Sequence, residues 1–253
     1  LTAGLRQVDP EVAIAAIRAT RRRELFRISA ADSLGLLSVD DVGPALSAIA
    51  DATIQAALAV ATATVLVDGI QAEDLVEFVV VGMGRYGGEE LGYGSDADVM
   101  FVYRTREGVD EAAASDAATS VANELRRLLA LPSADPPIDM DADLRPEGRN
   151  GPIVRSLASY AAYYERWSAA WEAQALLRAR PVAGSPALQD AFIELIDPIR
   201  YPADGVSSAD LLEMRRLKAR MEAERLPRGA DPALHLKLGR GGLSDVEWVA
   251  QLQ

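Results

Sequence analysis

The sequence predicts an α+β fold in which a small sheet is embedded in a mostly helical chain. Apolar residues recur every three or four positions before residue 76 and again after Gly151, a spacing typical of helices with one buried face. Strand-forming residues dominate only in segments 78–103 and 138–144. The chain has 253 residues, 49% of them apolar, which is enough for a substantial core in one large or two modest domains.

The chain before the first strand is expected to be helical over residues 10–76. Apolar positions repeat at Val12, Ile14 and Ile17, and a second helix is expected to start near Ser38 and run to about Gly69. The basic run Arg21-Arg22-Arg23 is more typical of a solvated helix face than of a binding site.

Helices are also expected between and after the two strand segments. Residues 110–131 form an amphipathic pattern that Pro132 ends. Later helical patterns cover residues 156–180, 186–200, 207–226 and 243–252.

Composition excludes several classes of protein. The chain has no cysteine, which rules out disulfides, thiolate catalysis and cysteine-based zinc sites. Its net charge of −12 argues against broad binding to nucleic acid. No segment approaches the roughly 18 uninterrupted apolar residues of a membrane span, and no secretory leader is visible. We therefore expect a cytoplasmic protein with neither nucleic acid nor membrane as a partner. Because the chain begins and ends within a pattern of polar and apolar residues, we also expect it to be a fragment of a longer chain.

A glycine-rich segment follows the first strand pattern. Gly82, Gly84 and Gly87 formally match the dinucleotide fingerprint. That fingerprint needs a crossover helix before the next strand, and the gap to Asp96 is too short and too rich in glycine for one. Glycine backbone suits close approach to phosphate, so Gly84, Gly87, Gly88 and the Ser95 hydroxyl are candidates for nucleotide binding. The alternative is a tight hairpin without a ligand.

Two aspartates at the start of the next strand carry the strongest signal. Asp96 and Asp98 are two positions apart, so on a strand their carboxylates point to the same side. Two carboxylates in so apolar a segment repel each other unless a cation lies between them. Mg²⁺ bound to nucleotide phosphates is the leading candidate, which indicates nucleotidyl transfer.

Three more acids alternate with apolar residues in segment 138–144. Asp139, Asp141 and Asp143 would share one face of a strand. A solvated edge strand tolerates such repulsion, but a shared cation explains it better. If this strand lies beside residues 96–103, one of these acids completes a three-carboxylate site for two Mg²⁺ ions.

Several cations are candidates to bind the triphosphate of ATP, because guanidinium groups bind phosphate in a bidentate manner. Those near the acids include Arg85, Arg145 and Arg178.

Four ordered blocks resemble the family of bacterial glutamine synthetase adenylyltransferase/adenylyl-removing enzymes, in the polymerase-β-like nucleotidyltransferase superfamily. These blocks are residues 82–98, with Ser95-Asp96-Ala97-Asp98, residues 141–152, residues 171–180 and residues 241–248. The resemblance implies that Asp96, Asp98 and Asp141 are the catalytic metal ligands. Asp143 stands where the family often has arginine, and Arg85 stands where lysine is common.

The resemblance also implies an architecture and a reaction. A polymerase-β-like core with a small mixed sheet, residues 73–152, would lie between helical segments 1–72 and 153–253. The enzyme would move AMP from ATP to a tyrosine of glutamine synthetase, and the full-length protein would respond to the PII signal protein. The sequence around Ser95 resembles the C-terminal, adenylylating half of the family more closely. Two alternatives are phosphorolytic removal of AMP and a non-catalytic module that binds nucleotide or PII.

Overall fold

The computed structural model describes residues 9–167, 170–227, 229–231 and 233–252. By their contacts these residues form two compact units. The first joins Leu1–Tyr163 with Arg178–Leu195, and the second joins Tyr164–Leu177 with Ile196–Gln253. The first unit contains the sheet, so the helices before the sheet and the sheet itself belong to one body. The division into 1–72, 73–152 and 153–253 stays a prediction.

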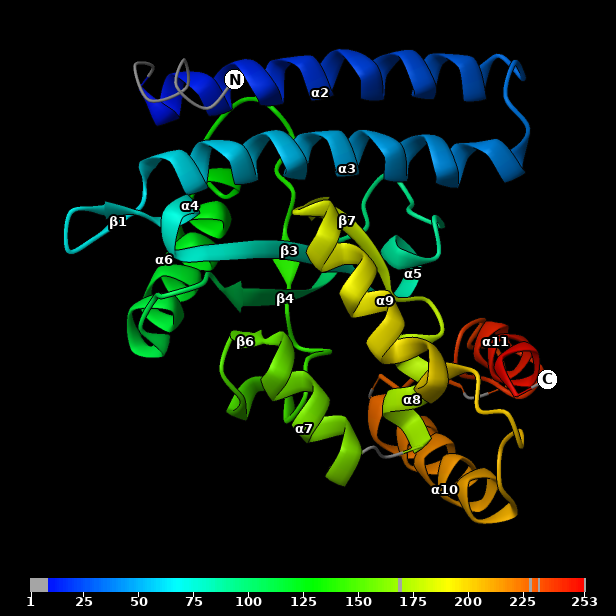
Figure 1. Cartoon of the computed structure of the whole chain (residues 1–253). Helices are drawn as coiled ribbons and strands as arrows, with labels where there is room; N and C mark the ends of the chain where they lie inside the picture. Colours follow the sequence, from blue (N-terminus) through cyan, green and yellow to red (C-terminus); the bar gives the residue numbers. More distant parts are fainter. Residues whose placement is uncertain (1–8, 168–169, 228, 232, 253) are drawn as a thin grey trace. The chain divides into compact units, whose positions relative to one another are not determined.

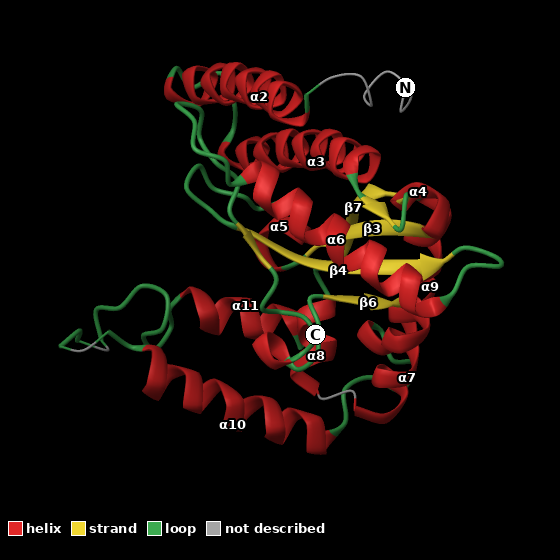
Figure 2. Ribbon diagram, turned by 90° about the vertical axis from the view of Figure 1, so that its left-hand side faces the viewer, coloured by secondary structure: helices red, strands yellow, loops and turns green. Residues whose placement is uncertain are grey.

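Two long antiparallel helices open the described chain. Helix α2 (Pro10–Ser33) begins after Asp9, whose carboxylate accepts a hydrogen bond from the Glu11 amide at 2.8 Å. Helix α3 (Val39–Thr64) begins after Ser38, as the sequence predicts. Figures 1 and 2 show α3 lying between α2 and the sheet.

By length and composition, α3 is the one helix in the described ranges that is apolar enough to cross a membrane. Half of its most apolar window is buried inside the molecule, and buried core helices pass the same test. Its contacts with α2, α6 and β7 account for that apolar face.

Residues 65–76 correct the helical prediction. Helix α3 ends at Thr64, and a two-stranded hairpin follows, formed by β1 (Leu66–Val67) and β2 (Ile70–Gln71). Asp68 and Gly69 form its turn with φ of 50° and 81°, a conformation that Asp-Gly pairs favour. The short helix α4 (Ala72–Leu75) then leads into the sheet.

The sheet is mixed and its strands follow the order β5-β4-β3-β7, with β6 also paired to β4. Strands β3 (Val76–Gly82) and β4 (Ala97–Thr105) are antiparallel, from Val76 opposite Thr105 to Gly82 opposite Val99. Strands β5 (Met140–Asp141) and β6 (Val154–Ser156) run parallel to β4. Strand β7 (Arg180–Gly184) runs antiparallel to β3. The predicted α+β class, with a small mixed sheet in a mostly helical chain, is confirmed.

Apolar burial on both faces holds the sheet in place. Val79, Val80 and Val81 are fully buried, as strands with both faces covered require. Helix α6 (Glu111–Leu129) packs against the sheet. Its N-terminus is capped by the Asp110 side chain. Helix α7 (Leu157–Trp167) places Tyr160 in the core, where its hydroxyl donates to the Phe101 carbonyl at 3.3 Å.

The segment after Gly151 also differs from its helical prediction. Residues 154–156 form β6, and the expected helix 156–180 gives way to α7, α8 (Ala170–Leu176) and strand β7. The helices predicted over 186–200, 207–226 and 243–252 are present as α9 (Pro186–Arg200), α10 (Ser208–Arg225) and α11 (Leu243–Gln251).

The second unit is helical and uses polar contacts between its own elements. Gln174 of α8 donates to Gln251 of α11 at 2.6 Å. Lys218 of α10 binds Glu222 on its own helix and Asp245 on α11.

Candidate metal and nucleotide site

The turn after β3 brings backbone against the Asp98 carboxylate. Strand β3 ends at Gly82, and the one-turn helix α5 (Gly84–Gly87) follows. Gly84 has a φ of +53°, which side chains disfavour. A Cβ at Gly84 would lie 2.6 Å from Asp98 Oδ2. Glycine at this position therefore leaves the space that the Asp98 carboxylate occupies.

Gly87 and Gly88 have a packing role. A Cβ at Gly87 would lie 1.9 Å from the Arg178 carbonyl oxygen, and one at Gly88 would lie 2.9 Å from Arg178 Cδ. These two glycines let α5 pack directly against the segment that precedes β7. Their predicted contact with phosphate stays a prediction.

Three carboxylates meet where β4 and β5 begin. Ala97 pairs with Met140 and Asp98 pairs with Asp141, and the Ala97 amide donates to the Asp139 carbonyl at 2.8 Å. Asp96, Asp98 and Asp141 each offer an oxygen, and these oxygens all lie within 4.8 Å of one another. The family resemblance implied that these three acids act together, and the register of β4 and β5 brings them together.

The other two acids of segment 138–144 line the same depression as Asp96 and Asp141 but are not part of the triad. Strand β5 is only two residues long, so the expected strand with three acids on one face is wrong. The chain turns after Ala142, and Asp143 forms an ion pair with Arg149 at 2.5 Å. Asp139 contributes its backbone carbonyl to the pairing with β4.

The triad has the donor set of a site for a hard cation. Ionised carboxylates are acceptor-only oxygen ligands, the type that Mg²⁺ prefers. Asp98 and Asp141 are half-buried while Asp96 is exposed, so the site is open on one side. Asp96 and Asp141 line an open depression of about 520 Å³. The residues present therefore fit a bound Mg²⁺ that also contacts a substrate.

Comparison with known proteins identifies the family. The profile of one family, glutamate-ammonia ligase adenylyltransferase, matches residues 2–195. The chain belongs to the glutamate-ammonia ligase adenylyltransferase family. The resemblance found in the four sequence blocks is confirmed.

Curated relatives support the same assignment. The chain is 58% identical over 247 residues to the bifunctional glutamine synthetase adenylyltransferase/adenylyl-removing enzyme of Mycobacterium tuberculosis strain CDC 1551. It is 57% identical over 255 residues to the protein of that name from Streptomyces avermitilis, and 55% identical over 252 residues to that from Mycobacterium leprae. These matches cover 98%, 96% and 100% of this chain and 25% of each relative. The chain thus spans about a quarter of the length of these relatives.

Three candidate nucleotide-binding residues of this adenylyltransferase-family chain lie around the loop between α5 and β4. Arg85 Nε donates to the Glu90 carbonyl at 3.0 Å, and Arg178 Nη1 donates to the Glu90 carboxylate at 3.0 Å. The Ser95 hydroxyl accepts a hydrogen bond from the Gly92 amide at 3.1 Å. These contacts fix the loop that carries Asp96, and nucleotide binding by the three residues stays a prediction.

Arg145 lines the depression together with Asp141 of the triad. Its guanidinium donates to the Ala142 carbonyl at 2.6 Å and to the Gly151 carbonyl at 3.0 Å. Only 11% of its side chain is exposed. In this structure Arg145 braces the loop that follows β5, while its edge lines the depression.

Two further arginines lie near the triad or its supporting turn. Arg126 of α6 lines the depression beside Asp96 and Asp139. Sequence reasoning missed it, because no pattern distinguishes it from Arg127, which pairs with Glu124 on the same helix. Arg180 of β7 binds Asp51 of α3 at 2.6 Å and the Gly87 carbonyl at 3.2 Å, so it ties α5 to the helical layer.

The Arg180 contact also involves a buried tyrosine on α5. Tyr86 is fully buried, and its ring lies 5.8 Å from the Arg180 guanidinium. Burial, followed by the charge of Asp51, raises the pKa of the Tyr86 phenol well above its ordinary value. Tyr86 therefore remains neutral at physiological pH and supports the turn.

Proposed function

We propose that this chain transfers AMP from ATP to a tyrosine of glutamine synthetase in a Mg²⁺-dependent reaction. The observation that carries the proposal is the convergence of Asp96, Asp98 and Asp141 within 4.8 Å. Membership of the adenylyltransferase family supports it. The relatives whose names state this activity are about four times as long as the region they share with this chain, so activity of the isolated chain belongs to the proposal.

The three carboxylates would hold the metal, and neighbouring groups would hold the nucleotide. When bound, two Mg²⁺ ions supply positive charge for the attacking and leaving oxygens of an in-line displacement. Asp96 and Asp98 would position the nucleotide end of this site. Gly84, Arg85, Gly87, Gly88, Ser95 and Arg178 would line the triphosphate on one flank, with Arg145 on the other.

The acceptor tyrosine needs help to lose its proton. An unperturbed phenol has a pKa near 10 and is a poor nucleophile at neutral pH. Asp141, the third carboxylate of the triad, would accept that proton. The phenol oxygen then bonds to the α-phosphorus of ATP, the bond from that phosphorus to the bridging oxygen breaks, and pyrophosphate leaves. The protein's contribution is placement and charge.

A second candidate uses the same residues in the opposite direction. The relatives' name includes adenylyl-removing activity. Phosphate would attack the phosphorus of AMP-tyrosine, and ADP would leave with the tyrosine oxygen reprotonated. We place this chain in the C-terminal, adenylylating half of the family on the wording around Ser95, in a cytoplasmic protein that responds to PII. A non-catalytic module that binds nucleotide or PII would bind ATP without transferring it.

The direct test combines the chain with Mg²⁺, purified glutamine synthetase and ATP labelled at its α-phosphate. We expect label on glutamine synthetase. Asp96→Asn and Asp98→Asn should each reduce transfer by well over about 100-fold, because changes outside the ligand shell alone cost about 10–100-fold in metal sites. Circular dichroism should show both variants folded.

The alternatives are tested beside it, with phosphate and glutamine synthetase that already carries labelled AMP. Release of labelled ADP from adenylylated glutamine synthetase and phosphate, without forward transfer, supports the removing activity. Binding of ATP without either reaction supports the non-catalytic module. Near-normal transfer by either asparagine variant would refute the role of the carboxylates as metal ligands.

A further inference from the structure

Three arginines of α2 contact the segment that leads to Asp141. Arg18 donates to the carbonyls of Leu131 and Asp135, the latter at 2.7 Å. Arg21 Nη1 donates to the carbonyls of Pro136 and Pro137 at 2.7 and 3.3 Å. Arg22 pairs with the Asp135 carboxylate at 2.5 Å. We refer to Arg18, Arg21 and Arg22 as the arginine clamp.

The backbone carbonyls of this segment need hydrogen-bond donors from elsewhere in the protein, because the segment forms no regular backbone pairing. Residues 131–139 lie outside helix and strand. Three of these residues are prolines, which have no amide proton and cannot donate a backbone hydrogen bond: Pro132, Pro136 and Pro137. A buried carbonyl without a partner is costly, and Arg18 satisfies the buried carbonyl of Asp135. Pro136 and Pro137 are exposed, and there Arg21 supplies a donor in place of water. The contacts tie α2 to this segment. Within the basic run Arg21 is half-buried, while Arg22 and Arg23 are exposed, as expected of a solvated helix face.

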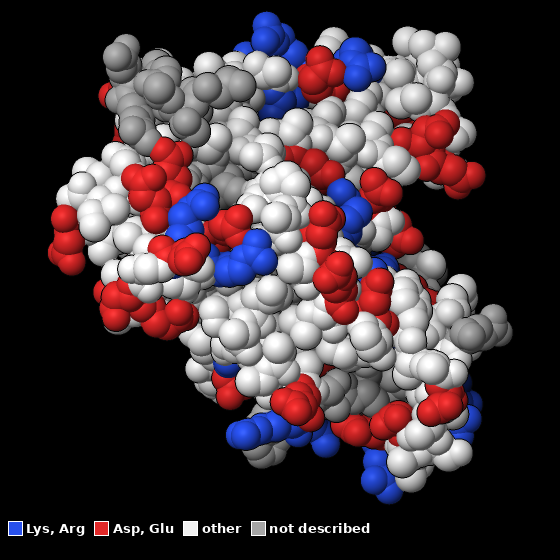
Figure 3. All heavy atoms as spheres, in the orientation of Figure 1, with Lys and Arg blue, Asp and Glu red and all other residues white. Residues whose placement is uncertain are grey.

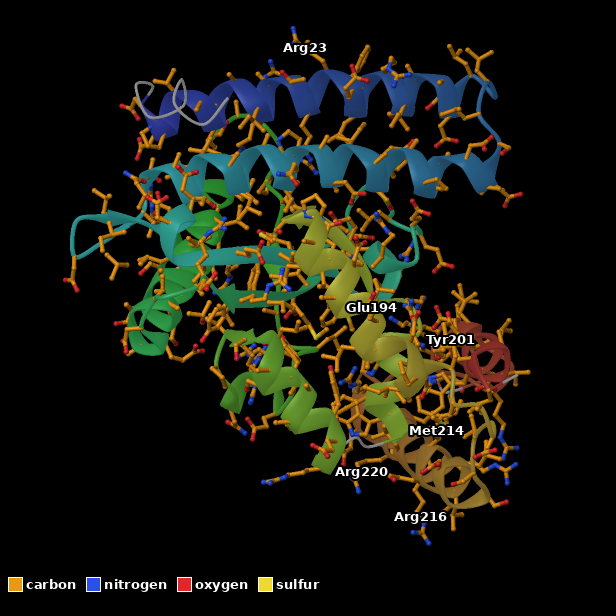
Figure 4. All side chains as sticks on the ribbon, viewed as in Figure 1. Arg23, Glu194, Tyr201, Met214, Arg216 and Arg220 are labelled. Carbon is orange, nitrogen blue, oxygen red and sulfur yellow. The ribbon has the colours of Figure 1, made fainter. Side chains whose placement is uncertain are left out.

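The three arginines of the clamp differ in burial, from buried Arg18 to half-buried Arg21 and exposed Arg22. Arg18 is only 3% exposed, although it carries a charge. Burial, and then the neighbouring charge of Arg18, lower the pKa of the Arg21 guanidinium. By contrast, Arg23 of the same basic run is exposed and donates to Thr20 on its own helix. Figure 4 shows Arg23 pointing away from α3, and Figure 3 shows basic side chains along this upper edge.

Strand β5 is so short that its position depends on how the preceding segment is held. It pairs with β4 only at Met140 and Asp141, and one further bond joins the Ala97 amide to the Asp139 carbonyl. Pro137, the last residue that the clamp contacts, is four positions before Asp141. The chain between these two anchors is thus held by α2 on one side and by β4 on the other.

We propose that the arginine clamp on α2 is a positioning device that sets the place of β5 and, through it, of Asp141 in the metal site. The metal part of this inference rests on the proposed function. The contacts of the clamp all fall on residues 131–137, so its residues act on the metal site through that segment.

The test uses Arg21→Met, with Arg23→Met as its matched control. Arg21 is half-buried, so its loss leaves the Pro136 and Pro137 carbonyls within reach of water and the chain folded. Replacing Arg18 would strand buried carbonyls, so that variant is not used. Because a single nitrogen of Arg21 makes both bonds, Arg21→Lys should restore part of the effect.

Two readouts separate the inference from the proposed function. Amide hydrogen exchange of Ala97, measured without metal, should be about fivefold faster in Arg21→Met, the scale of one or two lost hydrogen bonds. Binding of Mn²⁺, followed by the electron paramagnetic resonance of the free ion, should be about tenfold weaker, the low end for changes outside the ligand shell. Arg23→Met should match wild type in both, and melting temperatures should show all variants folded.

Each outcome decides one of the two hypotheses. Unchanged Ala97 exchange and unchanged Mn²⁺ affinity in folded Arg21→Met would overturn the positioning role. Equal effects in Arg23→Met would also overturn it, because a general loss of positive charge would then explain the result. If wild type binds no Mn²⁺, the proposed function fails, and the Ala97 exchange alone still decides whether the clamp holds β5.

Discussion

Gly84 illustrates how one missing side chain shapes the site. Replacing it with alanine would force a residue with a side chain to a φ of +53° and place its Cβ 2.6 Å from Asp98 Oδ2. The backbone strain should cost about 1–3 kcal/mol of stability. Displacing Asp98 should also weaken Mn²⁺ binding. Chemical denaturation and metal titration of Gly84→Ala measure these two effects separately.

Gly94 is the matched control for this substitution. It lies in the loop that follows α5 and has no unusual φ, and a methyl group added to it would meet nothing within 4 Å beyond its chain neighbours. Gly94→Ala should therefore match wild type in stability and metal binding. A Gly84→Ala variant with wild-type metal affinity would show that Asp98 does not need this space.

At the residue scale, the sequence specified part of the site. The two-residue spacing of Asp96 and Asp98 predicted that their carboxylates lie on one side, and they do converge although β4 begins only at Ala97. The same rule gave no choice among Asp139, Asp141 and Asp143. The register of β5 on β4 makes that choice, and register depends on contacts far away in the sequence. The arginine clamp was missed for the same reason, since Arg18 lies 113 residues from Leu131.

At the element scale, long periodic segments were predicted well and short strands were not. Helices α6, α9 and α10 have apolar faces or caps that the sequence displays. Strand β7 was missed, because its five residues include Pro181 and Gly184, which disfavour strands, and its pairing comes from the distant strand β3. The β1–β2 hairpin carried an Asp-Gly turn signal, but its two-residue strands merged with the apolar pattern of α3.

The contact between α10 and α11 gives a prediction about pH. A hydrogen bond from Lys218 and then one from the Gly241 amide lower the pKa of Asp245 below its ordinary value. A lowered folded-state pKa contributes stability that is present above the unfolded-state pKa and lost as pH falls through the folded-state value. Lys218→Met should therefore raise the pKa of Asp245 toward its ordinary value. A carboxyl titration by nuclear magnetic resonance measures this shift.

Lys237→Met provides the control, because Lys237 is exposed and is not among the groups that shift Asp245. Its Asp245 titration should match wild type. The interpretation is wrong if Lys218→Met leaves the midpoint of Asp245 unchanged. The hydrogen bond from the Gly241 amide to the Asp245 carboxylate, 2.7 Å long, remains in both variants.

At the scale of the whole molecule, the candidate site belongs entirely to one unit. All three acids of the triad, the glycine-rich turn and the arginine clamp lie in Leu1–Tyr163, and Arg178 and Arg180 lie in Arg178–Leu195. Helices α10 and α11 belong to the other unit. A ligand that binds only the folded form of one unit stabilises that unit by mass action.

Binding of Mg²⁺ with an unreactive ATP analogue should thus act on one unit of the chain. At a ligand concentration about 100 times the dissociation constant, linkage supplies about 2.7 kcal/mol to the unit that binds. Amides of β3, β4 and β5 should exchange more slowly, while those of α10 and α11 should keep their rates. Mass spectrometry of exchanged peptides measures both sets together. Asp98→Asn should abolish the slowing, and equal slowing in α10 and α11 would mean that the two units open together or that the ligand binds elsewhere.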